Sequence, residues 1–344
     1  MNFTTITIKD IATALNLSVS TVSKALRDSY EISEATKKVI NDYAREHNYR
    51  PNPIAQSLKQ GHSKSIGIVV PSVANQFFSQ VINGIESVAY DAGFNVIITQ
   101  THESLEREKE NVGHLTHRSI DGLLISLSTE TEDIDHLKRL HQQGLPIVFF
   151  DRVSEEIETH KVIADNFKGA YDATRHLIES GYMRIAHITS PPTISITVER
   201  LAGYKKALEE AGIRIPEDYI KYCAHGGRDI SEIENAVNDL LSLDDKPDAI
   251  LTTSDRITTT TLFLLNKLGV KIPQELALVG YTNTTLADVL NPSLSSVYQP
   301  GFEMGQKATE MLLSLILSKR PVYEFEKAVL PTQLFVRQST SPKK

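Results

Sequence analysis

Apolar residues recur at helical spacing in two short segments near the start of the chain, with a break between them. Those of the first segment share one helix face and are Ile8, Ile11, Ala12 and Leu15. Thr7 and Asp10 have the spacing of a capping box, in which each side chain accepts a hydrogen bond from a free amide. Asn16 tolerates the left-handed conformation that ends a helix, and Ser18 can cap the next one. The pattern predicts a helix-turn-helix.

The second of these helices has one apolar and one polar face. Its apolar stripe comprises Val22, Ala25 and Leu26, and its polar side comprises Ser20, Ser23, Lys24 and Arg27. Small polar residues let a helix approach a DNA major groove closely, and the Lys24 ammonium can donate to guanine. An ordinary amphipathic surface helix is the alternative. Ser33 can cap a third helix that runs to about His47, and three helices can bury one small core.

Residues 51–62 form a separate short segment. Pro51 stops the preceding helix, whereas Pro53 suits the first turn of a new one, with Asn52 as its cap. The helix expected over 54–59 ends near Gly61 and is too short to be stable alone in water. We therefore expect it to form only when something else holds it.

From Ser65 onward the pattern changes to alternating strands and helices. Apolar runs predict strands at 66–70, 95–100, 122–126, 146–151, 161–165, 184–189, 248–253 and 276–281. Helical patterns start near Phe77, Glu106, Asp133, Asn166, Arg200, Ser231 and Arg256. Because the strands are almost continuously apolar, we expect two consecutive parallel, doubly wound sheets with helices on both faces. A run at 295–300, a helix over about 302–318 and a run at 328–336 follow.

Composition and charge narrow the class of protein. The 344 residues are 40% hydrophobic and 23% charged, which fits two or three ordered, compact units. Although the net charge is −7, residues 1–64 hold nine Lys or Arg against six Asp or Glu, so the basic excess coincides with the helix-turn-helix. Cys223 is the only cysteine, which excludes an internal disulfide. Without a secretory signal or a membrane-spanning run, we expect a cytoplasmic protein that does not bind membranes.

Motifs of catalysis are missing from the sequence. It contains no dinucleotide-binding glycine fingerprint, no phosphate-binding loop, no metalloprotease helix and no nucleophile elbow. His114 and His117 can share a helix face, but no third ligand accompanies them. The sequence therefore predicts no metal site, no cofactor and no enzymatic activity.

Six segments, spread over essentially the whole chain, occur in a specific order and spacing. They are TIKDIATALNLSVSTVSKAL, YRPNPIAQSLKQGHSKSIGIVVP, DGLLIS, FFD, RLAGY and LGVKIPQELALVGY. With these segments the chain resembles the lactose/galactose-repressor family of bacterial transcription regulators. The resemblance implies a homodimer that binds a palindromic double-stranded DNA operator and is switched by a small-molecule effector, a sugar or a related metabolite.

The same resemblance implies a division of the chain. Residues 1–50 are the all-α DNA-binding domain, 51–62 the hinge helix, and 63–344 the effector-binding and dimerisation domain, similar to periplasmic binding proteins. Its lobe 1 is expected to take about 63–163 and 293–326. Its lobe 2 is expected to take about 164–292 and 327–340.

DNA contacts are also implied by the resemblance. Val19, Ser20 and Lys24 match base-reading positions, Thr21 and Ser23 match phosphate-contacting positions, and Thr7 and Tyr49 belong to the same DNA-binding set. In the hinge, Leu58 matches a leucine that wedges between base pairs from the minor groove, accompanied by Ala55 and Lys59. Packing of Leu58 on Ile54 is an alternative that can hold at the same time.

Effector contacts follow from a rule for open parallel sheets, whose ligands sit at the carboxyl ends of the strands. The residues that the rule selects are Phe77, Phe78, Gln100, Thr101, Asp151, Arg152, Asp165, Asn166, Ser190, Ser254, Asp255 and Thr282. The family resemblance adds Arg200 and Gln299. Aromatic rings can stack on a sugar or base while polar groups bond its edges. For Phe77 and Phe78, ordinary core packing is equally open.

The chain departs from the family pattern beside this expected site. Thr282 stands where relatives usually carry an acidic residue, and Arg256 stands where a small residue is usual. An anionic effector is therefore easier to accommodate, although Asp151 and Asp255 remain nearby. Two other classes compete with the regulator: a periplasmic-type sugar-binding protein without a regulatory role, and an enzyme built on two α/β lobes. The first lacks an export signal and has no use for residues 1–60, and the second lacks a catalytic set.

Overall fold

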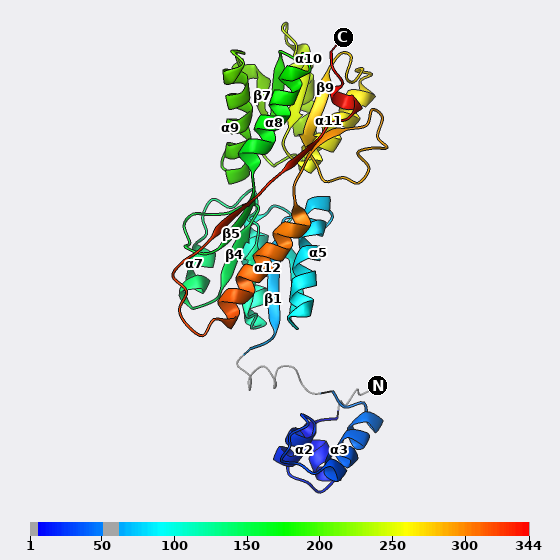
Figure 1. Ribbon diagram of the computed structural model, residues 1–344, viewed down its shortest axis with the longest axis vertical. Coiled ribbons are helices and arrows are strands. Elements are labelled where there is room, and N and C mark those ends of the chain that lie inside the picture. The colour runs from blue at the N-terminus through cyan, green and yellow to red at the C-terminus, as the bar shows by residue number, and fades with distance from the viewer. Residues whose placement is uncertain (1–5, 51–61, 344) are drawn as a thin grey trace. The chain divides into compact units, whose positions relative to one another are not determined.

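A computed structural model describes residues 6–50 and 62–343 (Figure 1). The chain divides into two compact units, Met1–Ser63 and Lys64–Lys344, and each is described by itself. The first is called the head below, and the second the ligand-binding domain.

The head contains the three predicted helices, α1 (Ile8–Ala14), α2 (Val19–Ala25) and α3 (Glu34–Glu46). Asn16 adopts the left-handed conformation, with φ of 53°, after α1 ends. Ser18 and Ser33 cap α2 and α3 by accepting hydrogen bonds from the amides of Thr21 and Thr36. One core joins the helices, built from Ile11, Ala12, Val22, Ala25, Ile40 and Ala44. The helix-turn-helix prediction and its caps are confirmed.

The first sheet of the ligand-binding domain has six parallel strands. They are β1 (Ser65–Val70), β2 (Asn95–Gln100), β3 (Gly122–Ile125), β4 (Ile147–Phe150), β5 (Lys161–Ala164) and β11 (Lys327–Leu330), in the order β11-β5-β4-β3-β1-β2. The helices packed with this sheet are α5 (Gln76–Asp91), α6 (Leu105–His117), α7 (Asp135–Gln142) and α12 (Gly301–Leu317). This sheet and these helices are called lobe 1.

The second sheet also has six strands. They are β6 (Ile185–Thr189), β7 (Ile220–Tyr222), β8 (Ala249–Thr252), β9 (Ala277–Tyr281), β10 (Ser295–Tyr298) and β12 (Gln333–Phe335), in the order β12-β10-β9-β8-β6-β7. Only the β10–β12 pair, within this described sheet, is antiparallel. Its helices are α8 (Asn166–Glu179), α9 (Ser195–Glu210), α10 (Ile230–Ser242) and α11 (Asp255–Lys267), with short 3₁₀ turns at Glu217–Tyr219 and Gln338–Thr340. This is lobe 2, and the doubly wound α/β prediction is confirmed.

The chain crosses between the lobes three times, and two of the predicted lobe boundaries are wrong. β10 was expected in lobe 1 but pairs with β9 of lobe 2, whereas β11 was expected in lobe 2 but pairs with β5 of lobe 1. The crossings therefore fall after β5, between β10 and α12, and between β11 and β12. The single apolar run at 328–336 is in fact two strands, separated at Pro331, whose partners lie in different sheets.

Helices α5 and α12, more than two hundred residues apart in sequence, lie side by side in lobe 1 (Figure 1). Two glycines allow this approach: a Cβ at Gly84 would lie 2.0 Å from the Phe302 carbonyl oxygen, and one at Gly305 would lie 2.1 Å from the Val81 oxygen. The periodicity of the sequence also missed β7, and it started α9 near Arg200 instead of at Ser195.

Candidate functional site

The exposed face of α2 is the first candidate site. Val22 and Ala25 are buried in the head core, which turns the opposite side of α2 outward. Val19 is 43% exposed, a large value for an apolar residue, and Ser20 is exposed beside it. Thr21, Ser23 and Lys24 are half-buried along the same helix. These residues predicted to contact DNA thus lie on one helix, whose opposite face packs against the head core.

Two side chains of the DNA-binding set already have local roles in the head. Thr7 caps α1: its amide donates to Asp10 Oδ2 at 2.8 Å, and the Asp10 amide donates to Thr7 Oγ1 at 3.3 Å. Hydrogen bonds from Thr7 hold the pKa of Asp10 below its usual value. Tyr49 packs against the head core, and burial raises the pKa of its hydroxyl. Ala55, Leu58 and Lys59 lie outside the described residues.

Arg200 of α9 is the most buried charged side chain of the expected effector site, at 2% exposure. Its Nε donates to Asn166 Oδ1 at 2.9 Å, and its Nη1 donates to the Thr253 carbonyl. The guanidinium lies over the Tyr281 ring, 3.9 Å from the ring centre. Burial lowers the pKa of Arg200. Its Nη2 has no hydrogen-bond partner among the described residues, so one buried donor remains for a ligand.

Lobe 1 contributes Asp151 and Arg152, directly after β4. Asp151 is buried with its backbone in the left-handed region, at φ of 58°, and burial raises the pKa of its carboxyl group. Arg152 forms a two-point ion pair with Glu103, through distances of 2.6 and 3.1 Å. Glu103 also accepts the Thr129 amide at 2.9 Å. The Arg152 charge is therefore largely neutralised inside the protein. Within the described part of the chain, the Asp151 carboxylate accepts only one long hydrogen bond, from the Ser126 hydroxyl at 3.5 Å.

Lobe 2 supplies polar groups after β8 and β9. Ser254 caps α11 by accepting the Ile257 amide at 3.3 Å, which fixes Asp255 in the first turn. The Thr282 hydroxyl donates to Asp255 Oδ1 and accepts the Thr284 amide. At the position where the family resemblance led us to expect an acid, this chain thus has a hydroxyl that is bonded to the Asp255 carboxylate. Ser190 follows β6 and is buried as well.

Gln299 occupies the second crossing between the lobes. Its backbone N–H donates to Asn283 Oδ1 at 3.0 Å, and its backbone carbonyl accepts a hydrogen bond from Asn283 Nδ2 at 2.7 Å. Asn283 Nδ2 also donates to Gln80 Oε1 on α5, so this amide cluster joins the two lobes. The Gln299 side-chain Nε2 is buried and, within the described part of the chain, has no acceptor.

Three predicted effector residues have other contacts. Phe77 and Phe78 are buried in the lobe 1 core with their rings 5.1 Å apart, edge to face, which is the packing role left open by the sequence. Gln100 Oε1 accepts the Val73 amide at 3.3 Å. The sequence in turn missed Glu103, Asn283 and Tyr281. Extending the strand-end rule by one or two residues would have found the first two, since both follow strands of the same sheets.

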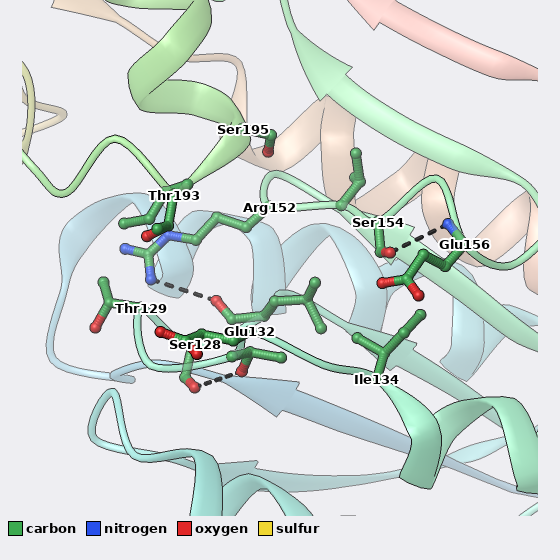
Figure 2. A pocket seen from close by; sticks show the side chains of 13 residues that line it. Ser128, Thr129, Glu132, Ile134, Arg152, Ser154, Glu156, Thr193 and Ser195 are labelled. Atoms are coloured by element: carbon green, nitrogen blue, oxygen red, sulfur yellow. Dashed lines mark hydrogen bonds between the residues drawn. The ribbon is translucent and has the colours of Figure 1, made fainter.

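A polar pocket of about 170 Å³ lies between the lobes (Figure 2). Its lining residues at the start of α9 are Thr193, Ile194 and Ser195, and those of lobe 1 are Leu127, Ser128, Thr129, Thr131, Glu132, Ile134, Arg152, Val153, Ser154 and Glu156. Arg152 is the predicted effector residue that lines it, and Figure 2 shows its side chain extending across the pocket toward Thr129.

A hydrogen bond joins the lobes away from the three crossings. Arg228, in the loop after β7, donates to the His102 carbonyl of lobe 1 at 2.9 Å. β2 and β7 are the sheet edges farthest from the crossing strands. The loops that follow them therefore meet across the interlobe space.

A helix-turn-helix head joined to a two-lobed domain with buried polar groups between its lobes defines a ligand-responsive DNA-binding regulator. Comparison with protein families supports both halves. Residues 7–52 match the model described as bacterial regulatory proteins, lacI family. Residues 63–335 match periplasmic binding proteins and sugar binding domain of LacI family. The chain belongs to the lacI family of bacterial transcription regulators.

Individual relatives agree with this assignment. The chain is 32% identical over 313 residues to the HTH-type transcriptional repressor PurR of Vibrio atlanticus, covering 91% of this chain and 92% of that one. A complex of the transcriptional regulator CelR with cellobiose matches with a TM-score of 0.72 and 28% identity, over 97% of this chain and 99% of that one. The lac repressor dimer bound to operator shares the fold, with a TM-score of 0.82 at 23% identity over 98% of this chain and 100% of that one.

Within the residues that the structure describes, no helix combines the length and the apolar character needed to cross a membrane.

Proposed function

We propose that the protein binds a palindromic operator as a homodimer, with α2 of each head in the major groove. A single helix-turn-helix reads few base pairs, and two-fold symmetry doubles the readout at a fixed half-site spacing. The exposed Val19 can contact a thymine methyl, and Lys24 can donate to guanine. Because the family binds DNA, we infer that the protein works in the cytoplasm.

We further propose that a small hydroxylated molecule, a sugar or a related metabolite, binds between the lobes. The observation that carries this proposal is that two buried donors, Arg200 Nη2 and Gln299 Nε2, have no acceptor among the residues that the structure describes. Buried polar atoms are normally bonded, so these two are suited to ligand oxygens. Asp151 is a buried carboxylate with little hydrogen bonding, and a ligand hydroxyl can donate to it while accepting from a neighbour.

The remaining predicted residues complete this site. They are Asn166, Ser190, Ser254, Asp255 and Thr282, with Arg152 at the pocket between the lobes. Contrary to the expectation drawn from Thr282 and Arg256, a neutral ligand suits the site better than an anionic one, because Arg152 is already paired with Glu103 and the Asp255 carboxylate lies beside Thr282. The cellobiose complex of the related regulator CelR is consistent with a neutral sugar.

Ligand binding between the lobes would change how they are set about the three crossings and thereby the affinity for DNA. The same coupling can serve an inducer that releases the operator or a corepressor that promotes operator binding.

Selection of DNA from a random library, with and without a pool of metabolites, tests this function. We expect enrichment of a palindrome and a change in enrichment when the pool is present. Recovery of unrelated sequences in both arms would contradict sequence-specific binding.

Calorimetric titration with paired sugars and sugar phosphates then tests the effector. Binding of the neutral members is expected. If only the phosphorylated members bound, the charge argument based on Arg152 would be wrong.

A further inference from the structure

Lys24, the predicted guanine-reading residue, is paired with an acid inside the head. Its ammonium forms an ion pair and hydrogen bond with Glu31 Oε2, seven residues further along. Both side chains are partly exposed, at 39% and 46%. Glu31 therefore lies on the same side of the head as the polar face of α2, although the sequence pattern gave it no role.

The backbone after α2 fixes this pairing. Asp28 adopts a left-handed conformation, with φ of 55°, and the Ser29 amide donates to the Lys24 carbonyl at 3.0 Å, so the chain reverses direction at once. On the far side of Glu31, Ile32 packs against the head core and Ser33 caps α3. Glu31 is thus held between two anchored positions, within reach of the Lys24 side chain.

The same loop is tied to α3 by a second set of charges. Lys37 is buried and contacts Asp28 at 2.7 Å and Glu34 at 2.8 Å. Those two acids are consequently engaged by Lys37, whereas Glu31 has Lys24 as its partner.

We propose that Glu31 is a positioning residue that sets the specificity of DNA binding through Lys24. This inference rests on the proposed role of Lys24. An ammonium has three donors, so Lys24 can keep one on Glu31 while it donates to O6 and N7 of a guanine in the groove. To reach a phosphate at the rim of the groove, Lys24 must leave Glu31, and the Glu31 carboxylate then repels that phosphate. Glu31 therefore lowers the affinity for non-specific DNA more than the affinity for the operator.

The test compares Glu31→Gln with the wild-type full-length protein. The probes are a palindromic duplex selected by the wild-type protein and a scrambled duplex of the same composition, titrated by fluorescence anisotropy at several salt concentrations. We expect Glu31→Gln to tighten binding to the scrambled duplex by about two- to fivefold, the range of an exposed ion pair, without tightening binding to the selected one. On scrambled DNA the slope of log K against log salt should steepen by about 0.9, the value for one added phosphate contact.

Two further variants isolate the pair. Glu46→Gln removes the same charge from an exposed position in the last turn of α3. It should leave the specificity ratio, the affinity for the selected duplex divided by that for the scrambled one, unchanged. In a Lys24→Met background, Glu31→Gln should no longer change the ratio. The proposal is overturned if Glu31→Gln leaves the ratio unaltered, if it tightens both duplexes equally, or if its effect on the ratio persists without Lys24, as direct cytosine reading by Glu31 would require.

The wild-type ratio of the two affinities tests the proposed function separately. A wild-type protein that binds both duplexes equally contradicts sequence-specific binding, whereas a selective wild-type protein with an unaffected Glu31→Gln variant contradicts only the role of Glu31.

Discussion

Gln299 bonds to the rest of the fold through its backbone, and its side-chain amide is available for a ligand. Its backbone N–H and carbonyl hold Asn283, while the side-chain Nε2 has no acceptor in the described part of the protein. A polar side chain that is buried without a partner opposes folding, because the hydrogen bond it gave up to water has not been replaced. The backbone contacts and the side-chain amide can therefore be changed independently.

Gln299→Met should weaken effector binding without unfolding the domain. Loss of one hydrogen bond costs about 0.5–1.5 kcal/mol, which is up to about tenfold in Kd. Calorimetry with a bound sugar measures the affinity, and thermal unfolding of the apoprotein provides the control. An unchanged Kd would remove Gln299 from the site.

Lys24→Ala should weaken binding to the selected duplex by ~1–3 kcal/mol and leave effector affinity unchanged. The physical reason is the loss of donors to a guanine edge. Anisotropy titrations on selected and scrambled duplexes measure the effect. An equal loss on both would make Lys24 a phosphate contact only.

His187 of β6 predicts a pH dependence of stability. It is fully buried with its ring stacked on Tyr204 at 4.7 Å, and burial lowers its pKa from 6.5 to about 3. Between these two values the unfolded chain binds a proton that the folded one does not, so stability falls as the pH decreases from about 6.5 toward 3. His187→Phe should flatten this dependence by up to about 1.4 kcal/mol per pH unit in urea unfolding. Identical slopes for both proteins would show that His187 does not remain neutral.

Residue-level prediction succeeded where the chemistry is local. The Thr7 and Asp10 capping box, the left-handed Asn16 and the Ser18 cap depend on neighbours within four positions, and all are present. Phe77 and Phe78 were ambiguous because an apolar ring suits a core as well as a ligand, and only the tertiary contacts show them in the core.

At the level of elements, the packing of α5 against α12 depends on glycine. Helical glycine normally destabilises relative to alanine, yet Gly84 and Gly305 lie where a Cβ would collide with backbone oxygens of the other helix. The contact is therefore a backbone approach that no larger residue permits. It secures the helix that follows the second crossing between the lobes.

Gly305→Ala should destabilise the ligand-binding domain, because its Cβ would meet the Val81 oxygen at 2.1 Å and force the helices apart. Gly113→Ala in α6 is the matched control, since no atom of the described residues lies within 4 Å of the added Cβ. That change should be neutral or stabilising, by about 0.5–1 kcal/mol. Urea unfolding of both variants measures the difference. Equal stabilities would contradict the close-packing account.

Element prediction failed where pairing is long-range. The run at 328–336 is mainly apolar, and its residues do not indicate that the first half pairs with β5 and the second half with β10. β10 was misplaced although its partners β9 and β12 are near in sequence, because its own residues do not distinguish one sheet from the other. Strand identity follows from local composition, but sheet membership depends on partners outside the segment, which for β11 lie more than a hundred residues away.

For the whole molecule, the central feature is a polar space between two lobes that are linked by three crossings. Arg200, Asp255 and Thr282 come from lobe 2, Asp151 comes from lobe 1, and Gln299 lies on a crossing. The Gln80–Asn283 bond and the Arg228–His102 bond also join the lobes, near and far from the crossings. A ligand that bonds to both lobes would therefore favour one arrangement of them over another.

The most direct test of the account is the Kd of the selected duplex with and without a sugar that binds in calorimetry, at constant salt. We predict a shift of about 5- to 150-fold at saturating sugar, the usual range of allosteric coupling. Gln299→Met should need more sugar to reach the same shift. An operator Kd that stays constant at full occupancy of the ligand site would contradict the account.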